Sequence, residues 1–99
     1  MIYHVITNTD WQKAQQQGFY EAASVATEGF MHCSRQEQVQ GVLERYYKGQ
    51  TGLLLLHIDE IKLIAPLKYE LAPSVHQEFP HIFGRLNLEA VVSVEALNL

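Results

Sequence analysis

The alternation of apolar and polar residues divides the chain into short β-strands and two helices. Residues 2–6 form a β-rich run in which every second side chain, His4 included, shares one face of a strand. Residues 53–58 are a nearly continuous apolar run of strand length, which is typical of a central strand buried on both faces. Residues 90–97 alternate again and predict a closing strand.

Two helices are predicted where a capping sequence precedes an amphipathic segment. Thr9 begins a capping box and Gly18 supplies a stop, which predicts a short helix over residues 10–17. Ser34 begins a second capping box, and apolar residues then recur at helical spacing, which predicts a longer helix over residues 35–48.

The remaining segments predict short strands and one shaped loop. Residues 29–33 and 68–71 are strand candidates, and residues 61–64 extend or follow the central strand. Residues 79–85 mix bulky apolar side chains with proline, histidine and glycine, which predicts a loop. The elements together predict one α+β domain over residues 1–99, with a small, mostly antiparallel split sheet and two helices on one side.

Composition narrows the class of protein and of partner. The chain carries a formal charge of -4, and its seven Lys and Arg residues are scattered, so a nucleic-acid partner is not expected. The longest apolar run, residues 53–56, is too short to cross a bilayer, and no secretory signal precedes it. The single cysteine, Cys33, suits a reducing compartment, and we therefore expect a cytoplasmic protein without a membrane partner.

Histidines are the leading candidates for chemistry. His4, His32 and His81 each stand beside aromatic or apolar neighbours in short, unusually composed segments. An imidazole on a strand face can bond a phosphate, a ribose hydroxyl or a carbonyl, and near neutrality it can also move a proton. The alternative for each ring is a structural hydrogen bond to a backbone carbonyl at the edge of the core.

Ser34 and Glu70 are further candidates with equally plain structural alternatives. Without a ligand, Ser34 is expected to cap the helix that follows it. With a ligand, the helix N-terminus and the neighbouring His32 would bind an anion. Glu70 would orient a ribose or stabilise a developing cation, or else it pairs with Lys68 or faces water. Cys33 is expected to be a buried small side chain.

Metal binding is not predicted. The conceivable ligands have no repeated cysteine pair and no His-Glu-x-x-His spacing, and only one thiolate is available. Those conceivable ligands are His32, Cys33, His57, His76 and His81.

Three motifs together resemble the DUF952 family of small, mostly bacterial proteins of uncharacterised function. They are Tyr3-His4, the segment 28–34 with the following helix, and the segment 79–84. The resemblance covers essentially the whole chain. It implies a fold similar to a minimal ADP-ribosyltransferase, the nucleotide-gripping core of enzymes that split NAD.

Within that superfamily the motifs are most similar to those of the RNA 2'-phosphotransferases, which also accept NAD. The resemblance implies that His4 and His32 contact the nucleotide and that Glu70 is the nearest equivalent of a catalytic glutamate. Two departures stand out. Val5 occupies a position where the superfamily often has glycine, and no arginine precedes His32 where the phosphotransferases have one.

The leading hypothesis is therefore a cleft that binds a nucleotide-like ligand, NAD or a fragment of it. His4, His32, Ser34 and His81 would line it. Catalysis, if present, would be cleavage of the nicotinamide glycosidic bond or transfer to a 2'-phosphate. His32, Glu70 and His81 would be the catalytic residues.

The alternative is a non-catalytic module that recognises a small anion or a protein partner. Arg85, beside the aromatic segment 79–84, would then be the anchor of the contact. Outward-facing aromatic rings in that segment favour the module, and rings that wall a pocket favour the ligand site. The sequence leaves open the choice between enzyme and binding protein, and the oligomeric state.

Overall fold

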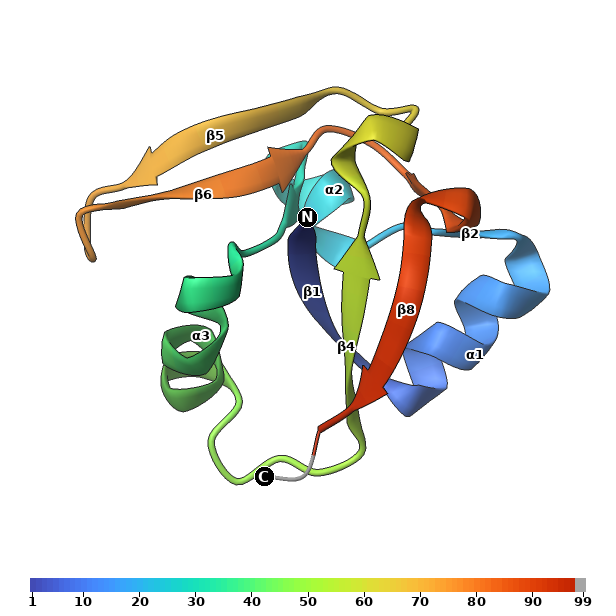
Figure 1. The fold of residues 1–99 in the computed structure, drawn as a ribbon, viewed down its shortest axis with the longest axis horizontal. Helices are drawn as coiled ribbons and strands as arrows, with labels where there is room; N and C mark the ends of the chain where they lie inside the picture. Colours follow the sequence, from blue (N-terminus) through green and yellow to red (C-terminus); the bar gives the residue numbers. More distant parts are fainter. Residues whose placement is uncertain (98–99) are drawn as a thin grey trace.

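The structure, a computed structural model that describes residues 1–97, is an α+β fold built on three small antiparallel sheets. The first sheet has the order β1-β4-β8, so that β4 is its central strand, as the continuous apolar run predicts (Figure 1). Its strands are β1 (Ile2–Thr7), β4 (Leu53–Ile58) and β8 (Val91–Ala96).

The second sheet lies across one end of the first and is joined to it through a single bridge (Figure 1). Tyr3 and Ser34 exchange two backbone hydrogen bonds of 2.8 Å, which tie the outer edge of β1 to the segment after β3. The second sheet has the order β3-β6-β5, and β2 pairs with β7 in a third. These strands are β2 (Phe19–Tyr20), β3 (Met31–His32), β5 (Leu67–Ala72), β6 (Gln77–Ile82) and β7 (Leu86–Asn87).

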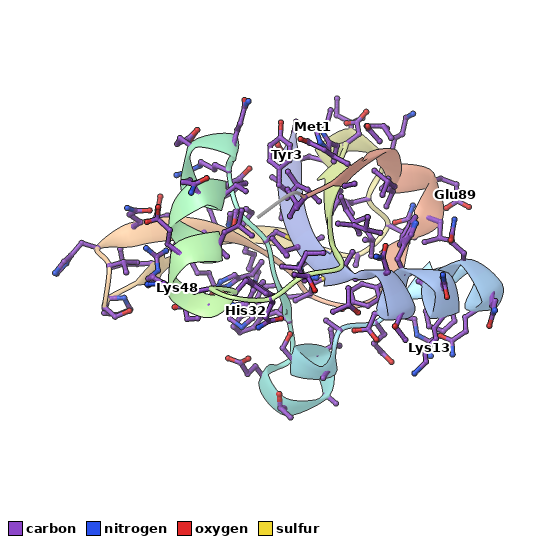
Figure 2. All side chains as sticks on the ribbon, turned by 90° about the horizontal axis from the view of Figure 1, so that it is seen from below. Met1, Tyr3, Lys13, His32, Lys48 and Glu89 are labelled. Carbon is purple, nitrogen blue, oxygen red and sulfur yellow. The ribbon has the colours of Figure 1, made fainter. Side chains whose placement is uncertain are left out.

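The helices do not share one side of the sheet, contrary to the expectation of two helices together. Figures 1 and 2 place α1 and α3 on opposite sides of β1, with α2 near β3. The helices are α1 (Asn8–Gln17), α2 (Ala23–Glu28) and α3 (Val39–Tyr46), and 3₁₀ turns cover Gln36–Gln38, Glu60–Lys62 and Leu88–Ala90.

Both faces of the first sheet are covered, which explains this arrangement. On one face Ile2 and Leu56 pack against Met31 and Ile82 from the second sheet, and all four are fully buried. On the other face the alternate residues of β1 and β4 pack against Leu43 of α3. Because successive side chains of a strand point to opposite faces, one helix alone could not cover both.

Both predicted helix caps are shifted. Thr7, not Thr9, caps α1 by accepting a 3.1 Å hydrogen bond from the Asp10 amide. Ser34 does not cap a helix: Arg35 is the N-cap residue, and its amide donates to the side-chain oxygen of Gln38 over 2.9 Å. The bridge to Tyr3 holds Ser34 in extended backbone, and this moves the helix start by one residue.

The segments 61–64 and 79–85 also differ from expectation. Residues 60–62 form a 3₁₀ turn, and Ile61 at 93% exposure extends no strand. Most of the expected loop is β6, with Pro80 inside it. The Pro80 carbonyl accepts a 3.0 Å bond from the Cys33 amide, so the missing proline N–H faces the short β3 side and leaves the ladder to β5 intact.

Candidate functional site

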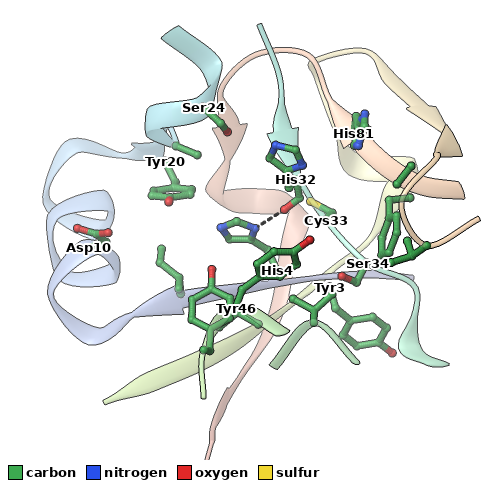
Figure 3. Close-up of a pocket in the computed structure, with 18 of the residues that line it drawn as sticks. Tyr3, His4, Asp10, Tyr20, Ser24, His32, Cys33, Ser34, Tyr46 and His81 are labelled. Carbon is green, nitrogen blue, oxygen red and sulfur yellow. Dashed lines mark hydrogen bonds between the residues drawn. The ribbon is translucent and has the colours of Figure 1, made fainter. Parts of the chain in front are cut away.

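A pocket of about 690 Å³ lies along the outer edge of β1 (Figure 3). The bridge between Tyr3 and Ser34 closes this edge at one end, and α1 begins at the other. The β5–β6 hairpin and the segment after β3 supply further walls. The structure brings four of the residues singled out from the sequence to this one pocket, namely His4, His32, Ser34 and His81.

His4 presents a hydrogen-bond acceptor to the pocket. Its Nδ1 lies 2.6 Å from the His32 carbonyl oxygen, so this nitrogen carries the proton and donates it. Burial lowers the pKa of His4 to about 4, more than the bond to the carbonyl raises it, and the ring is neutral at physiological pH. Nε2 makes no hydrogen bond within the described chain and faces the pocket (Figure 3). A neutral acceptor suits a ligand hydroxyl or N–H, which revises the expected donation to phosphate.

His81 is held by a carboxylate instead of a carbonyl. Its Nδ1 lies 2.7 Å from Glu70 Oε1, across the hairpin of β5 and β6. The Phe30 ring stacks on the imidazole with 4.1 Å between centroids. Glu70 does not itself line the pocket, so it acts there only through His81. A histidine oriented by a carboxylate is the arrangement that general bases use.

His32 lies at the rim, where its side chain is 54% exposed. Its Nε2 is 2.9 Å from Oε2 of Glu28, the last residue of α2, which lies four residues earlier in the sequence. The ring also meets the His81 ring edge-on, with 5.3 Å between centroids. His32 can therefore reach a ligand that extends out of the pocket.

Ser34 supplies a hydroxyl to the site. The residue is 7% exposed, and its side chain makes no hydrogen bond within residues 1–97. Because no fully buried side-chain polar atom of these residues lacks a partner, the Ser34 oxygen reaches the open space of the pocket. Because Ser34 does not cap a helix, this hydroxyl is available to a ligand. Cys33 beside it is buried as expected, and burial raises the pKa of its thiol, which rules against a reactive thiolate.

Arg85 does not line the pocket. Its guanidinium lies 4.1 Å from the centroid of the Phe19 ring, and its Nε lies 3.7 Å from Glu21 Oε2.

Of the two phenylalanine rings of the segment 79–84, Phe79 lines the pocket. Phe83 does not: it packs 5.3 Å from the Phe30 ring, and Lys68 Nζ lies 5.1 Å from the centroid of the Phe83 ring. By the criterion set from the sequence, this arrangement favours a ligand site over an outward contact surface.

The sequence did not point to the residues at the α1 end of the pocket. Asp10, Tyr20 and Tyr46 line this end (Figure 3). Tyr47 lines the pocket as well, and it acts on the Tyr20 phenol. Burial, helped by the charge of Asp10 and by Tyr47, raises the pKa of Tyr20 to about 12, so its ring is a neutral phenol. The apolar stripe that predicts the second helix ends at Tyr46, with Tyr47 next to it. Such a stripe is typical of side chains that face the core, so the pattern gives no sign that these rings line a pocket.

Other polar clusters of the described chain lie apart from this pocket. His57 bonds Glu95 over 3.0 Å on the first sheet, and His76 lies at the turn between β5 and β6. Within residues 1–97, no three His, Cys, Asp or Glu side chains are grouped to hold a metal ion. No helix of residues 1–97 has the length and apolarity needed to span a membrane.

Comparison with known proteins gives a family and a set of related folds. A family model described as "Protein of unknown function (DUF952)" matches residues 5–94. A crystal structure of protein CC0527 from Caulobacter crescentus is similar, with 31% identity, a TM-score of 0.90, and coverage of 99% of this chain and 86% of that one. The solution structure of CC0527 has a TM-score of 0.85 at 31% identity over 99% and 84% of the two chains. A search of curated proteins found no match.

Proposed function

Because the chain belongs to the DUF952 family, whose function is unknown, we propose a function from its own pocket: binding of a nucleotide-like small molecule, NAD or a fragment of it. The observation that carries the proposal is the convergence of His4, His32, His81 and the Ser34 hydroxyl on one hollow. These side chains come from β1, β6 and the segment between α2 and α3. If each histidine only made a structural hydrogen bond at the edge of the core, the rings would not be expected to meet at one pocket.

The polar groups match the hydroxyls and phosphates of such a ligand. His4 Nε2 accepts a hydrogen bond, which suits a ribose hydroxyl. Ser34 donates or accepts. His32 at the rim donates to a phosphate that extends outward when its Nε2–H exchanges the Glu28 carboxylate for that phosphate. The pocket volume of about 690 Å³ is in the range of small-molecule sites, and a dinucleotide would extend to the rim at His32. An ADP-ribosyltransferase-like use of the fold is part of this proposal.

The rival proposal, a module for a small anion or a protein partner, has less support. Its anchor, Arg85, is engaged with Phe19 and does not reach the pocket. Of its contact rings, Phe79 lines the pocket and Phe83 packs against Phe30.

Titration of the protein with NAD, ADP-ribose and 2'-phosphorylated nucleotides tests the binding. We expect at least one of them to raise the melting temperature and to shift the NMR signals of His32 and Ser34. His32→Ala should weaken this response, whereas His57→Ala, on a ring outside the pocket, should not. Absence of any response, or an equal response in both variants, would refute the proposal.

The His81–Glu70 pair favours a second candidate function, cleavage of the nicotinamide glycosidic bond of NAD. Water attacks the anomeric carbon of the ribose, and the bond to nicotinamide breaks. The bonding electrons neutralise the pyridinium nitrogen, and nicotinamide leaves uncharged. His81 takes the proton that the water loses, and the Glu70 carboxylate balances the imidazolium that forms.

Release of free nicotinamide from NAD measures this activity. We expect release by the wild type and a loss of about 100-fold or more in His81→Ala, the usual contribution of a general base. His57→Ala provides the matched control. Equal release by wild type and His81→Ala, or none by the wild type, would reject cleavage and leave the binding proposal standing.

A further inference from the structure

The two ends of the pocket differ in charge. At the α1 end stand the Asp10 carboxylate and the phenol rings of Tyr20 and Tyr46, and His4 Nε2 faces the same space (Figure 3). Asp10 is exposed and makes no ion pair within residues 1–97, although Lys13 lies three residues further along α1. No lysine or arginine is among the residues that line the pocket.

Such an end disfavours a phosphate group. A phosphate there would meet a carboxylate and a neutral acceptor, with no cation to replace its lost hydration. A positively charged group at this end would instead be attracted by its surroundings. The faces of tyrosine rings attract cations, and a carboxylate near them adds direct attraction.

We infer that the α1 end of the pocket binds a ring-sized organic cation, such as an N-substituted pyridinium, with Asp10 as its charge partner and Tyr20 as its aromatic wall. Oxidised NAD carries such a ring, so the inference rests on the proposed function and deepens it. The nicotinamide end would lie toward α1, and the phosphates would leave past His32. Tyr20 suits this role because its high pKa of about 12 keeps the phenol neutral. Tyr46 borders the same space, but it is 64% exposed and the Arg45 guanidinium lies 5.7 Å from the centroid of its ring.

Asp10 also has an ordinary structural explanation, because it lies in the first turn of α1. A carboxylate there interacts favourably with the helix dipole by a few tenths of a kcal/mol up to about 1 kcal/mol. This role predicts a change in stability on mutation but no preference for a charged ligand. Ligand charge therefore separates the two roles.

Two probes that differ in charge test the inference. 1-Methylnicotinamide is a pyridinium cation, and nicotinamide is the neutral ring without the methyl group. We expect the cation to bind about tenfold more tightly, as cation–π and carboxylate contacts allow, and to shift the NMR signals of Tyr20 and Tyr46. Asp10→Asn should remove most of this preference, and added salt should weaken it.

Glu37→Gln is the matched control, since it removes one carboxylate that does not line the pocket. It should leave the preference unchanged, and amide spectra of both variants check that they fold. Equal affinity for the two probes, or a preference that survives in Asp10→Asn, would overturn the inference.

The inference and the proposed function fail separately. Shifts at His32 and Ser34 with ADP-ribose, together with equal affinity for the two pyridine probes, would keep the nucleotide site and reject the cation site. A response to 1-methylnicotinamide at Tyr20, together with none to NAD or ADP-ribose, would keep the cation site and reject the nucleotide proposal.

Discussion

His4 and His81 line the same pocket from two different sheets, yet their rings are prepared for different chemistry. The Nδ1 atom of His4 donates to the carbonyl of His32, and the ring is neutral with a pKa of about 4. The Nδ1 atom of His81 lies against the Glu70 carboxylate. The first ring is a fixed acceptor, and the second has the negative partner that stabilises an imidazolium during proton transfer.

The difference shows that the partner of Nδ1, and not the residue type, assigns a role to each histidine. A carbonyl fixes the tautomer without adding a full charge, and burial then favours the neutral ring. A carboxylate fixes the tautomer and adds a charge. The variants His4→Gln and Glu70→Gln test the two rings directly, and Ser34→Ala and Glu28→Gln test groups that stand beside them.

The largest expected effect is a loss of stability in acid that depends on His4. Its pKa is about 4 in the folded chain and near 6.5 when exposed, so between these values the unfolded chain binds the extra proton. Stability is therefore constant above pH 6.5 and falls as the pH drops toward 4. The full window, about 2.5 pKa units, corresponds to roughly 3 kcal/mol. Urea unfolding at pH 7 and pH 4.5 measures it.

His4→Gln is the variant that isolates this effect. The glutamine keeps an N–H donor near the His32 carbonyl but does not titrate. Its unfolding free energy should fall less between pH 7 and 4.5 than that of the wild type. The same acid loss in both proteins would show that His4 is not held neutral.

A smaller effect is expected when the carboxylate partner of His81 is neutralised. Glu70→Gln keeps an oxygen that can accept from Nδ1 but removes the charge. Nicotinamide release should fall about tenfold to thirtyfold, ~1.4–2 kcal/mol in the activation barrier. Glu95→Gln, at the His57 pair outside the pocket, is the control. An undiminished rate in Glu70→Gln would remove Glu70 from the mechanism.

Ser34→Ala separates ligand binding from helix capping. The lost hydroxyl should weaken NAD binding by about fivefold, ~1 kcal/mol, the contribution of one hydrogen bond. The unfolding free energy should stay within ~0.5 kcal/mol of the wild type, because the hydroxyl caps no helix. A loss of ~1 kcal/mol in stability with unchanged binding would instead restore the cap.

The smallest effect is expected at the rim, where His32 pairs with Glu28. Both side chains are about half exposed, so Glu28→Gln should change the unfolding free energy by less than ~0.5 kcal/mol. Thermal unfolding at low and high salt checks this. A larger loss at low salt would mean that the pair holds β3 in place.

The first sheet could be predicted from the sequence because its pattern is local. Residues 2–6 are rich in β-forming side chains, and residues 53–58 are apolar except for His57, so strands buried on both faces follow from the local sequence. The second sheet was harder. Pro80 predicts a loop because proline has no N–H to donate to a neighbouring strand. A strand is possible here because the Pro80 backbone faces β3, which ends just before this position.

The sequence predicts several of the residues that form the site, but not which residues they bond to or lie beside. Tyr3-His4 and His32 stand in motifs that resemble a family, and the structure brings them to one pocket. The contact of His81 with Glu70 depends on the hairpin register, which no spacing revealed. Asp10 and Tyr20 carry no motif, and their proximity follows from the fold around β1.

The most direct test of the account is the protonation of His4 seen by nitrogen NMR of the imidazole rings, with and without NAD. We predict that at pH 6 Nδ1 of His4 carries the proton and Nε2 does not, and that NAD shifts the Nε2 signal while the rings of His57 stay unchanged. A proton on Nε2 in the free protein, or an Nε2 signal that does not respond to NAD, would contradict the account.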